Sequence, residues 1–131
     1  MAGLRNPSGV PMQYMLAFKE TTAEVARRDD PQQAPAYWGA WNAYVGAMYG
    51  AGVVVSGNGL QAPSTATTVR LVDGKRQLQD GPFADTREHL GGYFIIEVPS
   101  LDDALTWAER APCTSAGSTE VRPVLPPPNA A

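Results

Sequence analysis

The feature that most limits the possible folds is an apolar run of strand length at residues 91–98, Gly-Gly-Tyr-Phe-Ile-Ile-Glu-Val. Apolar residues in near-continuous succession, without the alternation of a half-exposed strand, predict a central β-strand that is covered on both faces. The rest of the chain must then supply neighbouring strands on both edges of this one, and helices that cover the sheet.

Shorter patterns on either side of the central strand predict the other elements. One helix is indicated by an aromatic stripe at helical spacing between Tyr37 and Met48, and a second is N-capped by Ser100 and stopped by Pro112. An Asp-Gly pair at 73–74 predicts a β-hairpin, because both central positions of a type I′ turn need positive φ. The predicted strands are residues 12–19, 53–56, 65–72, 75–80, 91–98 and 119–125.

The intervening segments are predicted as loops and turns. Residues 20–35 are polar and punctuated by proline, which predicts a long loop with room for one helical turn. The Gly-Asn-Gly sequence at 57–59 predicts a turn after the short second strand, and lacks the lysine and the following helix of a phosphate-binding loop. Glu88 and His89 are expected in a polar turn before the central strand.

The order of these elements is strand, helix, strand, hairpin, strand, helix, strand. With the hairpin treated as an insertion, this order predicts an α+β fold of the ferredoxin-like β-α-β-β-α-β type, with an antiparallel sheet. A single domain is expected over residues 12–125, with a flexible leader at 1–11 and a flexible tail at 126–131.

In such a fold the two helices lie on one face of the sheet and leave the other face uncovered. Ile95 and either Leu16 or Met15 are expected to point towards that uncovered face. Exposed apolar surface of this kind needs a cover, and a second copy of the chain is the simplest one. The sequence therefore predicts a homodimer.

Composition excludes several classes of function. The chain has 131 residues and a formal net charge of −3, so it has no basic field that would attract nucleic acid. Its one cysteine, Cys113, and its one histidine, His89, cannot form an intramolecular disulfide or a conventional zinc site, and no cofactor is expected. No apolar run approaches membrane-spanning length and no secretory pattern is present, so no membrane association and a cytoplasmic location are expected.

Several linked motifs resemble the DGPF-type subgroup of the YCII-related family. They are Gly-Leu-Gln at 59–61 with Thr-Ala-Thr-Thr-Val-Arg at 65–70, Asp-Gly-Pro-Phe-Ala-Asp-Thr-Arg-Glu at 80–88, Leu-Gly-Gly-Tyr-Phe-Ile-Ile-Glu-Val at 90–98, and Glu-Val-Arg-Pro-Val at 120–124. The resemblance implies a dimeric α+β barrel, made by two sheets packed face to face, with a cleft for a small molecule between barrel and helices. It also implies acid/base chemistry, since relatives include a dehydrochlorinase of a hydroxylated chloroaromatic and proteins with a proposed catalytic His/Asp pair.

The chain departs from the family pattern at one place. The histidine expected just after the first strand has no counterpart, and that region holds Glu20, Asp29 and Asp30 instead. The single histidine, His89, stands beside Glu88 much later in the chain. A His/Asp mechanism therefore does not transfer directly.

Three residues are candidate catalytic groups. Asp80 matches the aspartate of the family motif, and Phe83 and Tyr93 are neighbours that would raise the pKa of its carboxyl group. The alternative is that Asp80 only hydrogen-bonds backbone amides in its turn. Glu88 and His89 are the assisting candidates, because imidazole titrates near neutral pH; a solvent-exposed turn histidine without a role is the alternative.

Four residues are candidate substrate-binding groups: Phe83, Tyr93, Glu97 and Arg122. Glu97 interrupts the apolar strand and shares a face with Tyr93, so its charge needs a partner. Arg122 is expected on a neighbouring strand, where it either forms a structural ion pair with Glu97 or holds an anionic substrate.

The predicted function is small-molecule binding, by a cofactor-independent acid/base enzyme of lyase, isomerase or cyclase type, with no metal. Its substrate is expected to be small and cyclic or hydroxylated. The alternative is a non-catalytic ligand-binding or accessory protein, because similar proteins often occur beside sigma-factor regulatory systems.

Overall fold

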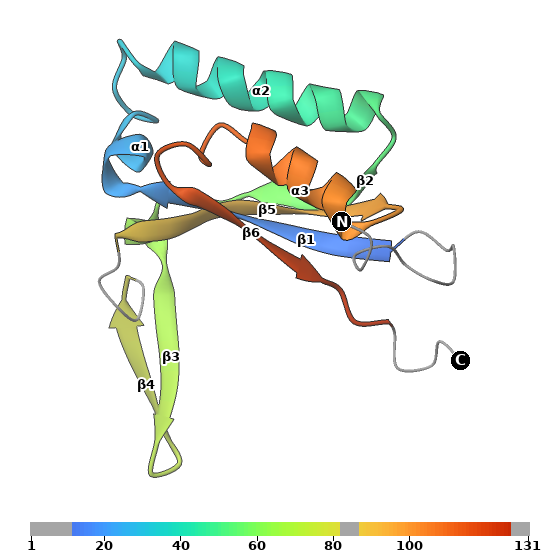
Figure 1. The fold of residues 1–131 in the computed structure, drawn as a ribbon. Helices are drawn as coiled ribbons and strands as arrows, with labels where there is room; N and C mark the ends of the chain where they lie inside the picture. Colours follow the sequence, from blue (N-terminus) through green and yellow to red (C-terminus); the bar gives the residue numbers. More distant parts are fainter. Residues whose placement is uncertain (1–11, 82–86, 127–131) are drawn as a thin grey trace.

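The computed structural model describes residues 12–81 and 87–126. Its main sheet has four antiparallel strands in the order β2-β5-β1-β6 (Figure 1). These strands are β1 (Met12–Thr21), β2 (Val54–Gly59), β5 (Glu88–Val98) and β6 (Ser118–Pro123). The helices are α1 (Thr22–Ala26), α2 (Ala34–Gly50) and α3 (Leu101–Arg110), with a short 3-10 turn, η2 (Pro63–Thr65). The mixture of helices and antiparallel strands confirms the predicted α+β class.

Helices α2 and α3 cover one face of the main sheet (Figure 1). Side chains alternate along β1 and β5, so every second residue of each strand faces these helices. Pro35 lies in the first turn of α2, where its missing N–H is not needed, and Ser100 caps α3 by accepting a hydrogen bond from the Asp103 N–H. The resulting core contains Tyr14, Leu16, Phe18, Tyr44, Met48, Phe94, Ile96, Val98, Ala104 and Ala108.

The opposite face of the sheet is left partly open by the described elements. Met15 and Ile95 lie opposite each other in the β1–β5 ladder on this face, and both are half-buried, whereas Leu16 is fully buried on the helix side. Thus Met15, and not Leu16, is the residue that shares the open face with Ile95. The described residues cover β5 on one face only, so they do not meet the expectation of cover on both faces.

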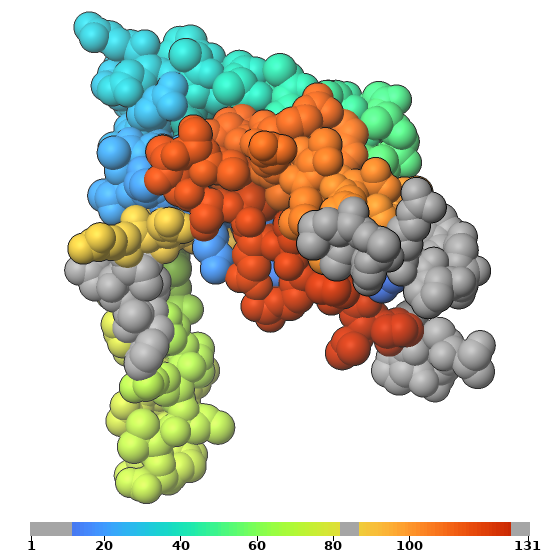
Figure 2. Space-filling model, viewed as in Figure 1, coloured from blue at the N-terminus to red at the C-terminus, as the bar shows by residue number. Residues whose placement is uncertain are grey.

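Strands β3 (Thr67–Val72) and β4 (Lys75–Asp80) form a separate two-stranded hairpin. Its turn has positive φ at both central residues, 52° at Asp73 and 75° at Gly74, as the Asp-Gly pair predicts. The hairpin stands away from the body on the side opposite the helices (Figures 1 and 2). All of β4 is exposed, so the other described elements leave the hairpin uncovered along this strand, and the hairpin forms an arm.

Two local predictions are wrong in detail. Residues 57–59 are not a turn: they belong to β2 and pair with residues 92–94 of β5. Glu88 and His89 lie inside β5 and not before it, because β5 continues to pair with β1 as far as Thr21. The helical turn expected within residues 20–35 is confirmed as α1, which is closed by a capping box between Thr21 and Glu24.

Some expectations fall on residues outside the described ranges. They are the leader at 1–11, most of the tail at 126–131, and Phe83. No helix in the described part of the chain combines the length and the apolar character needed to cross a membrane.

Candidate functional site

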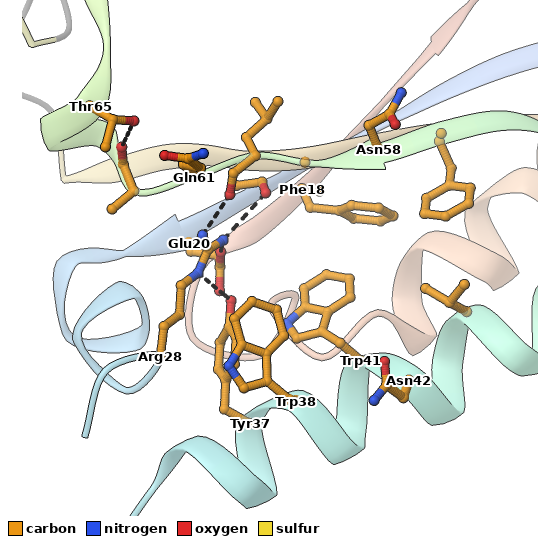
Figure 3. Close-up of a pocket in the computed structure, with 18 of the residues that line it drawn as sticks. Phe18, Glu20, Arg28, Tyr37, Trp38, Trp41, Asn42, Asn58, Gln61 and Thr65 are labelled. Carbon is orange, nitrogen blue, oxygen red and sulfur yellow. Dashed lines mark hydrogen bonds and ion pairs between the residues drawn. The ribbon is translucent and has the colours of Figure 1, made fainter. Parts of the chain in front are cut away.

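A cavity of about 880 Å³ lies on the helix side of the sheet, between α2 and strands β1, β2 and β5 (Figure 3). The segment from Leu60 to Thr65, which leads from β2 to the hairpin, forms part of its rim. Five aromatic residues line it: Phe18, Tyr37, Trp38, Trp41 and Phe94. The volume is within the range of small-molecule sites in proteins.

Glu20 lies in the wall of this cavity with only 1% of its surface exposed. It continues the alternation of Tyr14, Leu16 and Phe18 along β1, and so points to the helix side. A carboxylate in such a place needs partners, and it has two: Arg28 Nη2 donates to Oε1 at 2.6 Å, and the Tyr37 hydroxyl donates to Oε2. Both carboxylate oxygens are therefore occupied.

Arg28 joins four separate parts of the chain. It follows α1, and in addition to Glu20 its guanidinium donates to Tyr37 Oη at 3.0 Å, to the Leu60 carbonyl at 2.6 Å and to the Gly91 carbonyl at 3.3 Å. Burial alone would lower the pKa of Arg28, but its hydrogen bonds to Tyr37 and Glu20 outweigh burial and raise this pKa. The guanidinium is thus a fixed positive charge.

Tyr37 closes the cluster from the first turns of α2 and is itself buried, with 3% exposed. Burial, together with its hydrogen bond to Glu20, raises the pKa of its phenol above the ordinary value. The hydroxyl therefore stays protonated and acts as a neutral hydrogen-bond donor at physiological pH. Glu20, Arg28 and Tyr37 are called the charged cluster below.

Gly91 makes room for the charged cluster. The β1–β5 register shifts here, because Phe18 pairs with Gly92 and Lys19 pairs with Leu90, which leaves Gly91 opposite no residue of β1. A Cβ atom at Gly91 would lie 2.1 Å from Glu20 Oε1. The absence of a side chain at this position is what lets the Glu20 carboxylate lie against β5.

The aromatic walls are packed edge to face. The Trp41 ring lies 4.9 Å from the Phe18 ring, and Trp38 lies 4.7 Å from Tyr37, measured between ring centroids. Trp38 is 44% exposed, and the Arg28 guanidinium lies 5.5 Å from its ring. A flat ligand entering beside Trp38 would meet aromatic faces on one side and the charged cluster at the end.

The three predicted catalytic residues are not among those that line the cavity. Asp80 is exposed at the end of β4, where it pairs with Thr67 in the hairpin ladder. His89 Nε2 lies 3.2 Å from the Thr22 hydroxyl, and Glu88 accepts a hydrogen bond from the Ser118 hydroxyl. The structure therefore does not bring Asp80 together with Glu88 and His89 in this cavity.

The three predicted substrate-binding residues that the structure describes, Tyr93, Glu97 and Arg122, lie on the open face. The Tyr93 hydroxyl accepts a hydrogen bond from the Asn58 amide at 3.1 Å, and Glu97 is exposed opposite Gln13. The prediction of an ion pair between Glu97 and Arg122 is wrong. Strand β1 lies between β5, which carries Glu97, and β6, which carries Arg122, and Arg122 forms its ion pair with Glu120.

The charged cluster itself is missed by the sequence analysis, although one signal for it exists. Extending the first predicted strand by one residue places Glu20 on the same face as Phe18, and an unpaired carboxylate on a buried face indicates a site. Arg28 and Tyr37 carry no comparable local signal. Within the described ranges, no group of three or more His, Cys, Asp or Glu side chains is placed to hold a metal ion.

Comparison with known proteins gives a family and a curated relative. The relative is an uncharacterized protein of Rhizobium meliloti (strain 1021), 45% identical over 65 residues, which are 47% of this chain and 52% of the relative. The chain thus matches about half the length of this relative. Residues 12–127, which include every described element, match the YCII-related domain. The chain belongs to the YCII-related domain family.

Proposed function

We propose that this protein binds a small cyclic or hydroxylated molecule in the cavity between α2 and the sheet, and acts on it as a cofactor-independent acid/base enzyme. Lyase, isomerase and cyclase reactions fit this proposal, because they need proton transfer in a dry pocket but no electron carrier. The observation that carries the proposal is a buried carboxylate, Glu20, held by Arg28 and Tyr37 in the wall of an aromatic cavity.

Each member of the charged cluster has a proposed role. Glu20 is the proton acceptor, since it is the most buried carboxylate that lines the cavity. Tyr37 is the neutral donor: its single hydroxyl hydrogen, which Glu20 accepts in the structure, turns to an oxygen atom of the substrate and stabilises the charge developing there, which also frees Oε2 of Glu20. Arg28 fixes the position of both residues. The catalytic roles predicted from the sequence for Asp80, Glu88 and His89 remain predictions.

A second candidate function is non-catalytic ligand binding, as a carrier or as an accessory to a regulatory system. The observation that favours it is that both oxygens of Glu20 are already bonded within the protein. A general base must be able to reach a substrate proton, and this carboxylate must first exchange one of its partners to do so.

The experiment that separates the two candidates is a turnover screen. Wild-type protein and the variants E20Q, H89A and D80N are each incubated with a small-molecule extract, and the consumed and formed compounds are followed by mass spectrometry. We expect E20Q to abolish a conversion that the wild type performs. A compound that binds but is never converted supports the non-catalytic function. Turnover that survives in E20Q but is lost in H89A or D80N would show that His89 or Asp80, and not Glu20, is catalytic.

The proposal includes a homodimer with the architecture of a dimeric α+β barrel. The strand order β2-β5-β1-β6 supports the ferredoxin-like plan, and the half-buried Met15 and Ile95 on the open face supply an apolar surface for a second sheet. The motif at 80–83 supports membership of the DGPF-type subgroup, and a cytoplasmic location is part of the same proposal.

Light scattering at micromolar concentration tests the homodimer. We expect the wild type to have twice the chain mass of 13.9 kDa, and I95E to have the chain mass itself with an unchanged circular dichroism spectrum. The reason is that a carboxylate without a partner in a buried sheet interface costs several kcal/mol, about the scale of a moderate association energy. A wild-type monomer would contradict the proposed dimer.

A further inference from the structure

The ionisable side chains lining the cavity are few, and two of them form an ion pair whose charges cancel. Apart from the phenol of Tyr37 they are Glu20, Arg28 and Asp29. Glu20 and Arg28 are paired at 2.6 Å, and Asp29 is exposed. The described lining therefore offers one cation, which already has a carboxylate partner, and one solvated carboxylate.

Arg28 has little capacity left to bind an anion. A guanidinium has five N–H donors. Four hydrogen bonds already leave it, to Glu20, Tyr37 and the carbonyls of Leu60 and Gly91. An anionic ligand would have to take Arg28 from Glu20, and would leave that carboxylate buried and without its counter-charge.

A cationic ligand meets a different obstacle. Aromatic faces attract cations, but the Arg28 guanidinium already lies 5.5 Å from the Trp38 ring and 5.7 Å from the Tyr37 ring. Both oxygens of Glu20 are bonded, so a second cation would find no free buried carboxylate. Desolvating such a cation would therefore go largely uncompensated.

The remaining lining suits an uncharged flat molecule. Phe18, Trp41 and Phe94 present apolar rings, as Figure 3 shows for Phe18 and Trp41 around the space above α2. Gln61 and Ser64 on the rim add groups that can donate or accept hydrogen bonds. A ring with hydroxyl, carbonyl or amide substituents would bury its faces against the aromatic residues and keep its polar edge near the rim.

We infer that the cavity selects an uncharged, flat ring with hydrogen-bonding substituents and discriminates against anions, because the charged cluster neutralises itself. This inference rests on the proposed small-molecule site, and it names the chemical class of the ligand. It also predicts how selectivity changes when the charge of Glu20 is removed: the positive charge of Arg28 is then uncompensated, and the cavity becomes an anion site.

Three probes of nearly equal shape and different charge test the inference: benzamide, benzoate and benzamidine, which is a cation at neutral pH. Their dissociation constants are measured by ligand-observed NMR titration at pH 7.5 on the full chain. We expect benzamide to bind at least tenfold more tightly than benzoate, and more tightly than benzamidine. In E20Q we expect the ratio of benzoate to benzamide affinity to rise at least tenfold.

Two tryptophan variants show where the probes bind. W41L removes a ring that lines the cavity, and we expect it to weaken benzamide at least fivefold. W107L removes a half-buried ring that is not part of the cavity, and should leave benzamide affinity within twofold of wild type. Both substitutions remove a partly buried ring, so a general loss of stability would affect both.

The outcomes separate the inference from the proposed function. If benzoate or benzamidine binds as tightly as benzamide, and W41L weakens it, the small-molecule site stands and the inferred selectivity is wrong. If none of the three probes binds, or if W41L and W107L have equal effects, the proposed site fails and the inference fails with it. If E20Q does not fold, the wild-type ratio still decides the selectivity.

Discussion

Glu20 carries the main energetic cost of the site, which is the free energy of burying a charged carboxylate. It is among the few side chains of the described chain that are both fully buried and charged, and its two partners come from different elements. Replacing one member of a buried ion pair leaves the other buried without its counter-charge. Replacing both members leaves no uncompensated charge in the interior. The cluster should therefore behave as a unit when it is mutated.

This coupling is measurable by a double-mutant cycle. We expect R28M to lower the free energy of unfolding by about 3 kcal/mol, and R28M combined with E20Q to lower it by clearly less than the sum of the single changes. Urea denaturation followed by circular dichroism gives all four values.

The matched control for this cycle is R122M, which breaks the exposed pair between Arg122 and Glu120. Solvent screens this pair, so the variant should unfold close to wild type. Additive effects of R28M and E20Q would contradict the coupled cluster.

Gly91 gives a second test at the residue scale. A Cβ atom there would lie 2.1 Å from Glu20 Oε1, so G91A should lower the free energy of unfolding by about 1–3 kcal/mol through overpacking. G39A is the control, because Gly39 lies on α2 with nothing within 4 Å of the added atom, and alanine there should stabilise the helix by about 0.5–1 kcal/mol. Thermal unfolding of the two variants should shift in opposite directions; equal shifts would show that the Glu20 position is adaptable.

At the element scale, the β3–β4 hairpin exposes apolar side chains that no other described element of the same chain covers. Val69, Leu71 and Leu78 share one face of the hairpin with Arg76, which lies opposite Leu71, and all three apolar side chains are exposed. An isolated two-stranded hairpin is only marginally stable in water. The segment 67–80 contains three cations and two carboxylates, in a chain whose net charge is −3. A positively charged arm with an apolar face fits a second copy of this chain, which is acidic outside the arm.

A pair of lysine substitutions on adjacent residues tests the arm. We expect L71K to weaken the proposed homodimer at least tenfold, because it places a charge in the apolar face, while V72K adds the same charge to the opposite face and should have little effect. Sedimentation equilibrium gives both dissociation constants. Equal effects would mean that the apolar face of the arm is not part of an interface.

The elements that could be predicted are those determined by local chemistry. The Asp73–Gly74 turn follows from the need for positive φ, and the start of α3 follows from the cap at Ser100. Residues 57–59 have a turn-like composition but form a strand, because pairing with β5 outweighs local preference and the Phe94 ring occupies the space where a Cβ of Gly57 would be. The site depends on similar long-range contacts, since Arg28 reaches it from outside any regular element.

At the scale of the whole molecule, several buried acids share one response to pH. Burial raises the pKa of the Cys113 thiol and of the Tyr37 and Tyr44 phenols. In the unfolded chain these groups lose their protons at lower pH than in the folded one. Their contribution to stability is therefore complete below about pH 8.5 and is lost as pH rises towards the folded pKa values.

The expected result is a free energy of unfolding that falls between pH 8.5 and 11, by up to about 1.4 kcal/mol per pH unit for each group. Urea titrations across this range measure the slope. C113A should reduce the slope near pH 9–10 and Y44F should reduce it above pH 10, whatever their effect on absolute stability. A stability that is flat or rising over this range would show that these groups are not protected in the folded state.

Arg28 ties the end of β1, the start of α2, the rim at Leu60 and the bulge at Gly91 to one another, so the bonds that shape the cavity also hold the sheet and helix together. A substitution of Arg28 that changes which ligand binds should therefore also lower the stability of the fold. The cavity is also lined by Gln61, Ser64 and the half-exposed Trp38. None of the four hydrogen bonds of Arg28 goes to these three residues. New specificities should accumulate at the mouth of the cavity, while its inner end stays constant.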